Sequence, residues 1–190
     1  SELPSNDDYD FKTKPFDHQR KAFYMSRDKK AFALLMEQGT GKTKVIIDTA
    51  AYLYAKGKIT SIVVIAPNGV HRNWLREIDI HMPDWCPRKS FYYSSGMTKK
   101  RIEEYEDVLG ASDCLKVFTF NVEAFTSPKA IYYMQKILVS NKILLVVDES
   151  SRIKRPGAKR TKIITKFGKQ VDYKRIMTGT PVTKGPEDVY

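Results

Sequence analysis

The stretch "AFALLMEQGTGKTKVIIDTAAYLYAKG" (residues 31–57) decides the fold. It begins with a short apolar run, passes through a glycine-rich segment and continues from Lys42 to Lys56 with apolar residues at helical spacing. A buried strand, a tight loop and a helix are therefore expected in that order. Gly39 and Gly41 let such a loop turn sharply and bring its backbone N–H groups close to a bound anion.

This loop matches the phosphate-binding pattern G-x-x-x-x-G-K-[ST], except that Met36 stands where the first glycine belongs. The helix that follows would add its N-terminal N–H groups and its dipole to the anion site. We expect Lys42 to reach the β- and γ-phosphates of a nucleotide and Thr43 to ligate Mg²⁺. The alternative is a glycine-rich turn before a basic helix. The expected nucleotide contacts of this segment are Gly39, Thr40, Gly41, Lys42, Thr43 and Lys44.

Apolar, β-branched or aromatic runs alternate with helical spacing along the chain. This alternation predicts an α/β fold, with a mostly parallel central sheet between two layers of helices. The strands are expected at 31–36, 61–66, 89–93, 115–120, 143–148 and 173–178, and the helices at 42–56, 70–80, 98–109, 129–140 and 159–167.

The composition is that of a globular protein, with 190 residues, 42% of them hydrophobic and 29% charged. This length suits one domain. No apolar run is long enough to cross a bilayer, and the N-terminus does not resemble a secretory signal, so we expect an intracellular protein without a membrane span. Cys86 and Cys114 lack a C-x-x-C partner, and His81 and Cys86 lack a third and a fourth ligand, so a zinc site is not expected.

The net charge of +11 is concentrated in residues 152–175, which carry ten Lys or Arg and the single acid Asp172. A concentrated positive face is typical of proteins that bind the phosphate backbone of a nucleic acid. A basic surface that is merely solvated is the alternative.

The run "ILLVVDES" (143–150) ends the most apolar predicted strand with two acids. In parallel sheets, ligands bind beyond the carboxyl ends of the strands, which is where Asp148 would lie. Asp148 is the expected second ligand of Mg²⁺. Neighbouring residues at a strand end point in different directions, so Glu149 could face an attacking water and act as its general base.

Three motifs together resemble a known family. G-T-G-K-T, V-V-D-E-S-S-R-I-K and M-T-G-T-P-V-T-K-G-P-E-D are similar to motifs I, II and III of superfamily II helicases and translocases, and of their Swi/Snf-like branch in particular. The resemblance runs from about Pro15 to Tyr190. It implies a P-loop NTPase fold of the RecA-like type, with three layers (α/β/α), and the use of ATP and Mg²⁺. Ser151 departs from the usual fourth position of motif II and leaves its coupling to motif III open.

The resemblance also implies roles for residues outside the loop. "KPFDHQ" (14–19) resembles the Q motif, in which Gln19 would contact the adenine edge and Phe16 would shape the base pocket. Without that context, Gln19 would be taken for a surface residue that begins a helix. Trp74 is expected in the core. The implied nucleic-acid contacts are Asn68, Thr119, Asn121, Arg152 and Lys154, and the implied coupling residues are Thr178, Gly179 and Thr180.

Residues 14–190 are thus expected to form the N-terminal ATP-binding lobe of a DNA helicase or translocase, after a flexible N-terminus at 1–13. The family places an arginine finger in a second lobe, which is expected to be missing here, so this chain alone should hydrolyse ATP weakly or not at all. DNA is preferred to RNA by resemblance only. Two alternatives remain: a nucleic-acid-binding module with a weak or inactive ATP site, and a small-molecule phosphotransferase that uses a P-loop.

Overall fold

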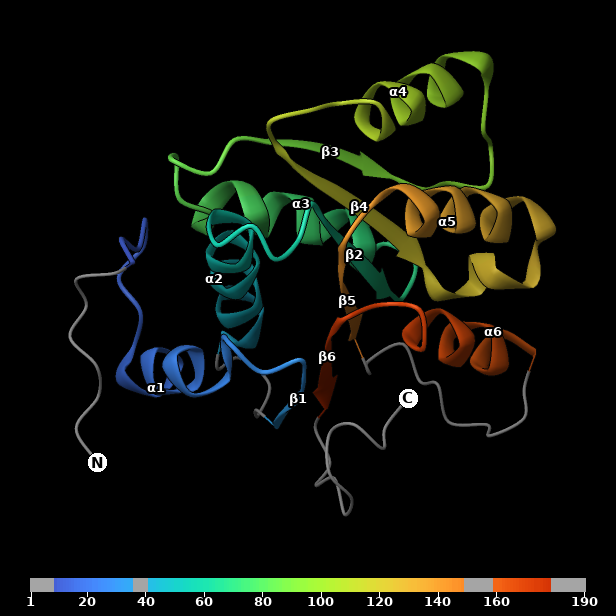
Figure 1. Cartoon of the computed structure of the whole chain (residues 1–190). Coiled ribbons are helices and arrows are strands. Elements are labelled where there is room, and N and C mark those ends of the chain that lie inside the picture. Colours follow the sequence, from blue (N-terminus) through green and yellow to red (C-terminus); the bar gives the residue numbers. More distant parts are fainter. Residues whose placement is uncertain (1–8, 36–40, 149–158, 179–190) are drawn as a thin grey trace.

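A six-stranded sheet forms the centre of the computed structural model, which describes residues 9–35, 41–148 and 159–178 (Figure 1). Every pair of neighbouring strands is parallel, and the strand order is β1-β6-β5-β2-β4-β3. The expected parallel α/β fold is confirmed. The strands are β1 (Ala31–Leu35), β2 (Ser61–Ala66), β3 (Arg88–Tyr92), β4 (Leu115–Asn121), β5 (Ile143–Asp148) and β6 (Tyr173–Thr178).

Helices cover both faces of this sheet (Figure 1). One face packs against α1 (Asp17–Ser26), α2 (Lys42–Ala55) and α3 (Val70–His81). The other packs against α4 (Lys99–Leu109), α5 (Pro128–Ser140) and α6 (Lys159–Gly168), with the 3₁₀ helix η2 (Val122–Thr126) between β4 and α5. Each face therefore has its own apolar core.

The two central strands show why the sequence adopts this arrangement. Every residue of β2 and of β5 is buried, as expected for strands covered on both faces. Alternate residues of β2 enter opposite cores: Ile62 and Val64 pack with α2 and α3, whereas Val63 and Ile65 pack with α4 and α5. A one-residue slip in register would exchange these two sets, so the packing specifies the register.

All six predicted strands are present, with bounds within one residue of those expected. Helix α1 and η2 were not predicted as elements. Helix α1 begins where the Phe16 N–H donates to Gln19 Oε1 at 2.8 Å, a bond between the N-cap and the third helical residue.

Residues 9–13, which belong to the N-terminal segment expected to be flexible, pack against the fold. Tyr9 is buried and its ring lies 4.7 Å from that of Phe23 and 5.5 Å from that of Trp85. Thr13 Oγ1 lies 2.7 Å from His81 Nδ1. This segment therefore packs against α1, α3 and the turn after α3, while residues 1–8 lie outside the described part of the chain.

Candidate functional site

The carboxyl ends of β1, β6 and β5 lie side by side. The register pairs Leu35 with Thr178 and Asp148 with Met177, so Asp148 and Thr178 lie at the same edge of the sheet. Asp148 is 6% exposed and Thr178 is 2% exposed. The edge thus brings together a carboxylate and a hydroxyl that the sequence places 30 residues apart.

Helix α2 begins at this edge, because it follows β1. Its N-cap, Gly41, has φ +75°, a left-handed conformation that glycine adopts without steric cost. Lys42 and Thr43 occupy the first turn and are half-buried. The N-terminal N–H groups of a 14-residue helix therefore face the same edge as Asp148.

Gln19 connects α1 to this loop. Its Nε2 donates to the Gly41 carbonyl at 3.1 Å, and the side chain is 6% exposed, so it is not the surface residue of the alternative interpretation. A Cβ at position 41 would lie 1.9 Å from that nitrogen. Both the backbone angle and the neighbouring amide therefore require glycine here.

Phe16 precedes α1 and lies on the surface near Gln19. Its ring is 70% exposed and stacks on His18, with 5.9 Å between the centroids and 7° between the planes. An exposed aromatic pair beside a buried amide is a suitable environment for a planar base.

Lys44 does not point toward the loop. Its Nζ donates to Asp48 Oδ2 at 2.8 Å, and the Tyr9 hydroxyl donates to Asp48 Oδ1 at 2.7 Å. All three side chains are buried, and the Lys44 ammonium lies 5.0 Å from the centre of the Phe11 ring. Burial raises the pKa of Asp48 and also that of Tyr9. The Lys44 side chain is therefore held by an ion pair inside the core.

The adjacent half of the edge contains β2 and β4. Ala66 pairs with Asn121 in the register, and Asn68 follows β2 as an exposed residue, so Asn68 and Asn121 lie at the same edge. Asn121 Nδ2 donates to Glu123 Oε2 at 3.3 Å. Thr119, in contrast, is 0% exposed within β4, so its expected contact with a nucleic acid is wrong for this conformation.

Two arginines that the sequence did not single out gather at this half of the edge. The guanidinium groups of Arg72 and Arg101 lie 4.6 Å and 4.2 Å from the centre of the Tyr92 ring. Arg101 also donates to the Tyr92 carbonyl. No local pattern marks this cluster, because it depends on the packing of α3 and α4 around the end of β3.

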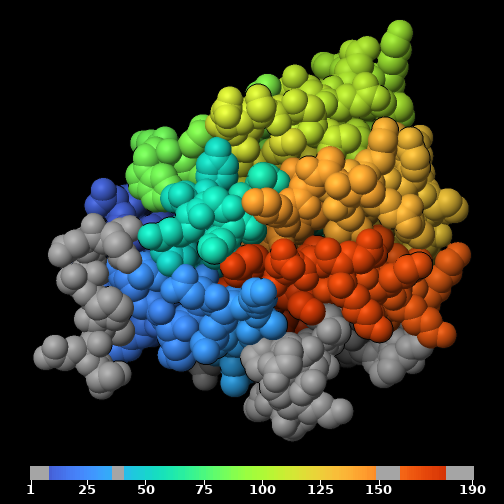
Figure 2. Space-filling view, viewed as in Figure 1, coloured from blue at the N-terminus to red at the C-terminus, as the bar shows by residue number. Residues whose placement is uncertain are grey.

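In the described part of the basic segment, several lysines are exposed, whereas Arg175 is buried in the core. Lys159, Lys162 and Lys166 are exposed at the spacing of one helical face of α6, and Lys169 is exposed just after it; α6 lies on the outside of the molecule beside α5 (Figure 2). Arg175 is buried instead. One of its Nη atoms donates to the Ser26 carbonyl at 2.7 Å, and burial lowers its pKa to about 10. Arg175 therefore adds no charge to this surface.

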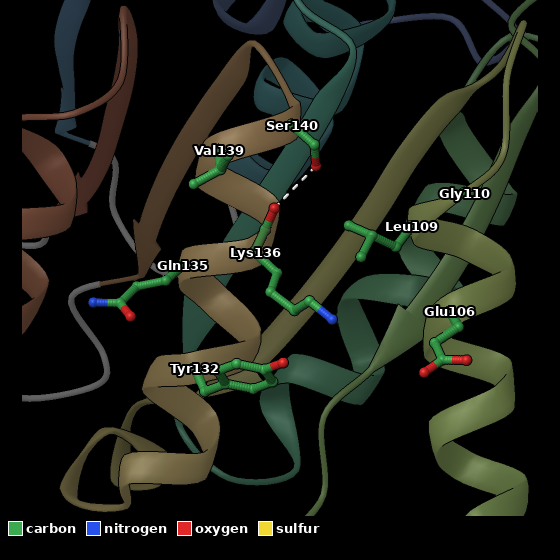
Figure 3. Close-up of a pocket in the computed structure, with 8 residues that line it drawn as sticks. All are labelled: Glu106, Leu109, Gly110, Tyr132, Gln135, Lys136, Val139 and Ser140. Carbon is green, nitrogen blue, oxygen red and sulfur yellow. Dashed lines mark hydrogen bonds between the residues drawn. The ribbon is translucent and has the colours of Figure 1, made fainter.

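A separate groove of about 510 Å³ lies between α4 and α5 (Figure 3). Tyr132 and Val139 are 54% and 87% exposed along it. The C-terminal ends of α4 and α5 line it, and these ends lead to the amino ends of β4 and β5. The groove is therefore remote from the edge that carries Asp148, and it contains none of the predicted site residues.

Seven predicted site residues lie outside the described part of the chain: Gly39, Thr40, Glu149, Arg152, Lys154, Gly179 and Thr180. Among the residues at 9–35, 41–148 and 159–178, no cluster of three or more His, Cys, Asp or Glu could hold a metal ion. No helix in that part of the chain is long and apolar enough to cross a membrane. Trp74 is a buried core residue, as predicted, and Cys86 is also buried in the core.

Comparison with known families shows which family the chain belongs to. The profile of the SNF2-related domain matches residues 17–190. The chain belongs to the SNF2-related domain family. The expected Swi/Snf-like resemblance is thereby confirmed, and the matched region contains both the start of α2 and the end of β5.

Relatives in this family are much longer proteins. The chain is 27% identical over 156 residues to the bovine SWI/SNF-related matrix-associated actin-dependent regulator of chromatin subfamily A containing DEAD/H box 1, covering 77% of this chain and 13% of that protein. It is 26% identical over 167 residues to the yeast ISWI chromatin-remodeling complex ATPase ISW1, covering 87% and 14%. The chain thus spans about one seventh of these relatives.

Solved structures share the fold. The SWI2/SNF2 ATPase core of Sulfolobus solfataricus in complex with double-stranded DNA superposes with a TM-score of 0.66 at 20% identity, over 95% of this chain and 35% of that one. The UvsW helicase of bacteriophage T4 gives a TM-score of 0.60 at 10% identity, over 90% and 55%. The RecA-like lobe expected from the sequence is confirmed as the fold.

Proposed function

We propose that this chain is the ATP-binding lobe of a DNA-dependent helicase or translocase. One observation carries the proposal: the first turn of α2, with Lys42 and Thr43, begins at the same sheet edge as Asp148 and Thr178. Membership of the SNF2-related domain family supports it. Such an edge offers N–H groups, an ammonium and a carboxylate to a nucleotide bound with Mg²⁺.

The residues present fit this ligand. Lys42 would neutralise the β- and γ-phosphates, and Thr43 and Asp148 would hold Mg²⁺, which compensates the charge that develops on the transferred phosphoryl group. Glu149 would orient the attacking water, and Thr178, Gly179 and Thr180 would link the γ-phosphate to the nucleic-acid side. Gly39, Thr40 and Gly41 would surround the phosphates.

The base would lie beside α1. Phe16 provides an exposed aromatic face, and Gln19 provides a buried amide 3.1 Å from the loop carbonyl of Gly41. We propose that Gln19 both reads the adenine edge and positions the loop. An amide that does both would make base recognition and loop geometry interdependent.

DNA would lie along the half of the edge formed by β2, β4 and β3. Asn68 and Asn121 would contact phosphates, with positive charge from the arginines around Tyr92, from α6 and from Arg152 and Lys154. Contacts of this kind carry no sequence information, which suits an enzyme that moves along DNA. A second lobe that supplies an arginine finger would raise the rate about 10³- to 10⁵-fold.

The test is a titration of the chain with Mg·ATP, followed by the hydrolysis rate with and without double-stranded DNA. Lys42→Ala should lose ATP affinity and keep the fold, whereas Glu149→Gln should bind ATP and lose the remaining turnover. Lys58→Ala, an exposed lysine at the opposite edge, is the matched control. Equal ATP affinity of Lys42→Ala and the parent would reject the nucleotide site.

Met36 in place of the first loop glycine motivates one alternative, a nucleic-acid-binding module with a weak ATP site. That alternative predicts DNA binding that ATP does not change. The ATP titration, combined with a DNA-binding measurement with and without Mg·ATP, distinguishes it, because this module would bind DNA but show no saturable ATP binding at millimolar concentration.

A further inference from the structure

His71 is a buried histidine between the loop that follows β2 and the residue that follows β3, at the carboxyl edge of the sheet. It lies in the first turn of α3 and is 1% exposed. Its Nε2 lies 2.9 Å from the Tyr93 carbonyl, directly after β3, and its Nδ1 lies 3.2 Å from the Gly69 nitrogen, in the loop after β2. One imidazole thus joins the loops that follow two different strands.

The partners determine the tautomer. The Gly69 N–H can only donate, so Nδ1 must accept, and the Tyr93 carbonyl can only accept, so Nε2 must carry the proton. Both bonds require a neutral ring. Burial lowers the pKa of His71, against the opposing effect of the Tyr93 and Pro67 backbone and of Glu123, while Arg72 lowers it further. The two hydrogen bonds and the lowered pKa therefore both favour the neutral imidazole.

The loop that His71 holds has an unusual backbone. Gly69 has φ +87°, and Asn68 and Gly69 are both exposed. The bond to Nδ1 is local and fixes the orientation of the Gly69 peptide relative to α3. The bond to Tyr93 anchors the ring from outside the helix, and Tyr93 N in turn donates to the Thr119 carbonyl at 2.8 Å. The loop is thereby attached to β3 and β4.

We propose that His71 is the positioning residue that holds loop 67–70 in the conformation in which Asn68 contacts a nucleic-acid phosphate. This role rests on the proposed function. The two ring nitrogens have different roles. The bond to Nδ1 fixes the backbone of the loop, and the bond from Nε2 fixes the orientation of the ring. His71 itself is buried and touches no nucleic acid.

Three variants separate these bonds. His71→Leu fills the space and removes both of them, His71→Asn keeps an acceptor near Nδ1, and His71→Gln keeps a donor near Nε2. His81→Leu is the matched control, because it removes a histidine from the opposite end of the same helix. The probe is a double-stranded DNA of random sequence, with urea unfolding measured for every variant.

We expect His71→Leu to weaken DNA binding about tenfold, His71→Asn to recover most of that loss, and His71→Gln to recover stability but not affinity. His81→Leu should bind DNA as the parent does. Equal DNA affinity of the parent and of folded His71→Leu would overturn the proposal, as would equal rescue by Asn and Gln.

A second readout does not depend on DNA. In NMR spectra of the parent, the His71 proton should reside on Nε2, and exchange of the Gly69 amide should be slow in the parent and in His71→Asn but fast in His71→Leu. If the parent does not bind DNA but these signals are found, the DNA part of the proposed function fails while His71 remains the residue that orders the loop. A proton on Nδ1 would overturn the positioning role itself.

Discussion

The Gln19 amide nitrogen lies 3.1 Å from the Gly41 carbonyl oxygen and so joins α1 to the N-cap of α2. The contact connects residues 22 positions apart, across the loop that is expected to surround the phosphates. Because Gly41 also has φ +75°, the geometry of the loop end depends on two independent constraints, a backbone angle and a side-chain amide.

These two constraints can be separated by a double-mutant cycle. Gly41→Ala should lower the free energy of unfolding by about 2 to 4 kcal/mol, from the positive φ and from the clash of its Cβ with Gln19. In a Gln19→Ala background the clash is removed, so the same substitution should cost only about 1 to 2 kcal/mol. Urea unfolding of the four proteins measures the coupling.

Gly57→Ala is the control for the backbone term. Gly57 has φ +72°, but no atom lies within 4 Å of a Cβ built there, so its cost should not depend on Gln19. If Gly41→Ala cost the same in both backgrounds, the amide would not constrain the loop.

The buried ion pair of α2 leads to a prediction about stability. Asp48→Asn keeps the shape of the side chain but leaves the Lys44 ammonium without its carboxylate, which should cost about 3 to 5 kcal/mol. Replacing the whole network by Tyr9→Phe, Lys44→Met and Asp48→Leu should restore stability to near the parent level, because no buried polar group then lacks a partner.

The exposed pair of Lys12 and Asp84, at 2.9 Å, is the matched comparison. Asp84 is 85% exposed, so Asp84→Asn should change the free energy of unfolding by less than about 1 kcal/mol. Fluorescence of Trp74 and Trp85 in urea follows all of these variants. An Asp48→Asn protein as stable as the parent would show that the ion pair does not stabilise the fold.

The sequence predicted the sheet and the position of Asp148 because both depend on local signals: apolar runs set the strands, and parallel strands carry their ligands at the carboxyl edge. The direction of Lys44 could not be predicted in the same way. It depends on Asp48, one helical turn away, but also on Tyr9, which is 39 residues from Asp48 in the chain. The local signal for this ion pair is the i,i+4 spacing of Lys44 and Asp48 within an apolar helix.

Thr119 and Arg175 show a second limit of sequence patterns. Thr119 belongs to β4, which has neighbours on both sides and helices on both faces, so a polar residue there is buried although its motif suggests a surface. Arg175 belongs to the basic segment 152–175 of the sequence, but its guanidinium lies in the core and donates to the Ser26 carbonyl in α1. Which charges reach the surface follows from the packing of distant elements.

The exposed lysines of α6 can be tested through the salt dependence of DNA binding. If they contribute to DNA binding, Lys162→Gln with Lys166→Gln should weaken binding at low salt and reduce the slope of log K against log salt by about 1.8, the release of two counterions. Lys56→Gln with Lys58→Gln removes the same charge from exposed lysines between α2 and β2, at the opposite edge, and should leave the slope unchanged. Filter binding to double-stranded DNA between about 50 and 200 mM salt measures both variants. Equal slopes in the two variants would mean that the α6 lysines are a solvated surface, and DNA contacts would then be confined to the edge formed by β2, β4 and β3.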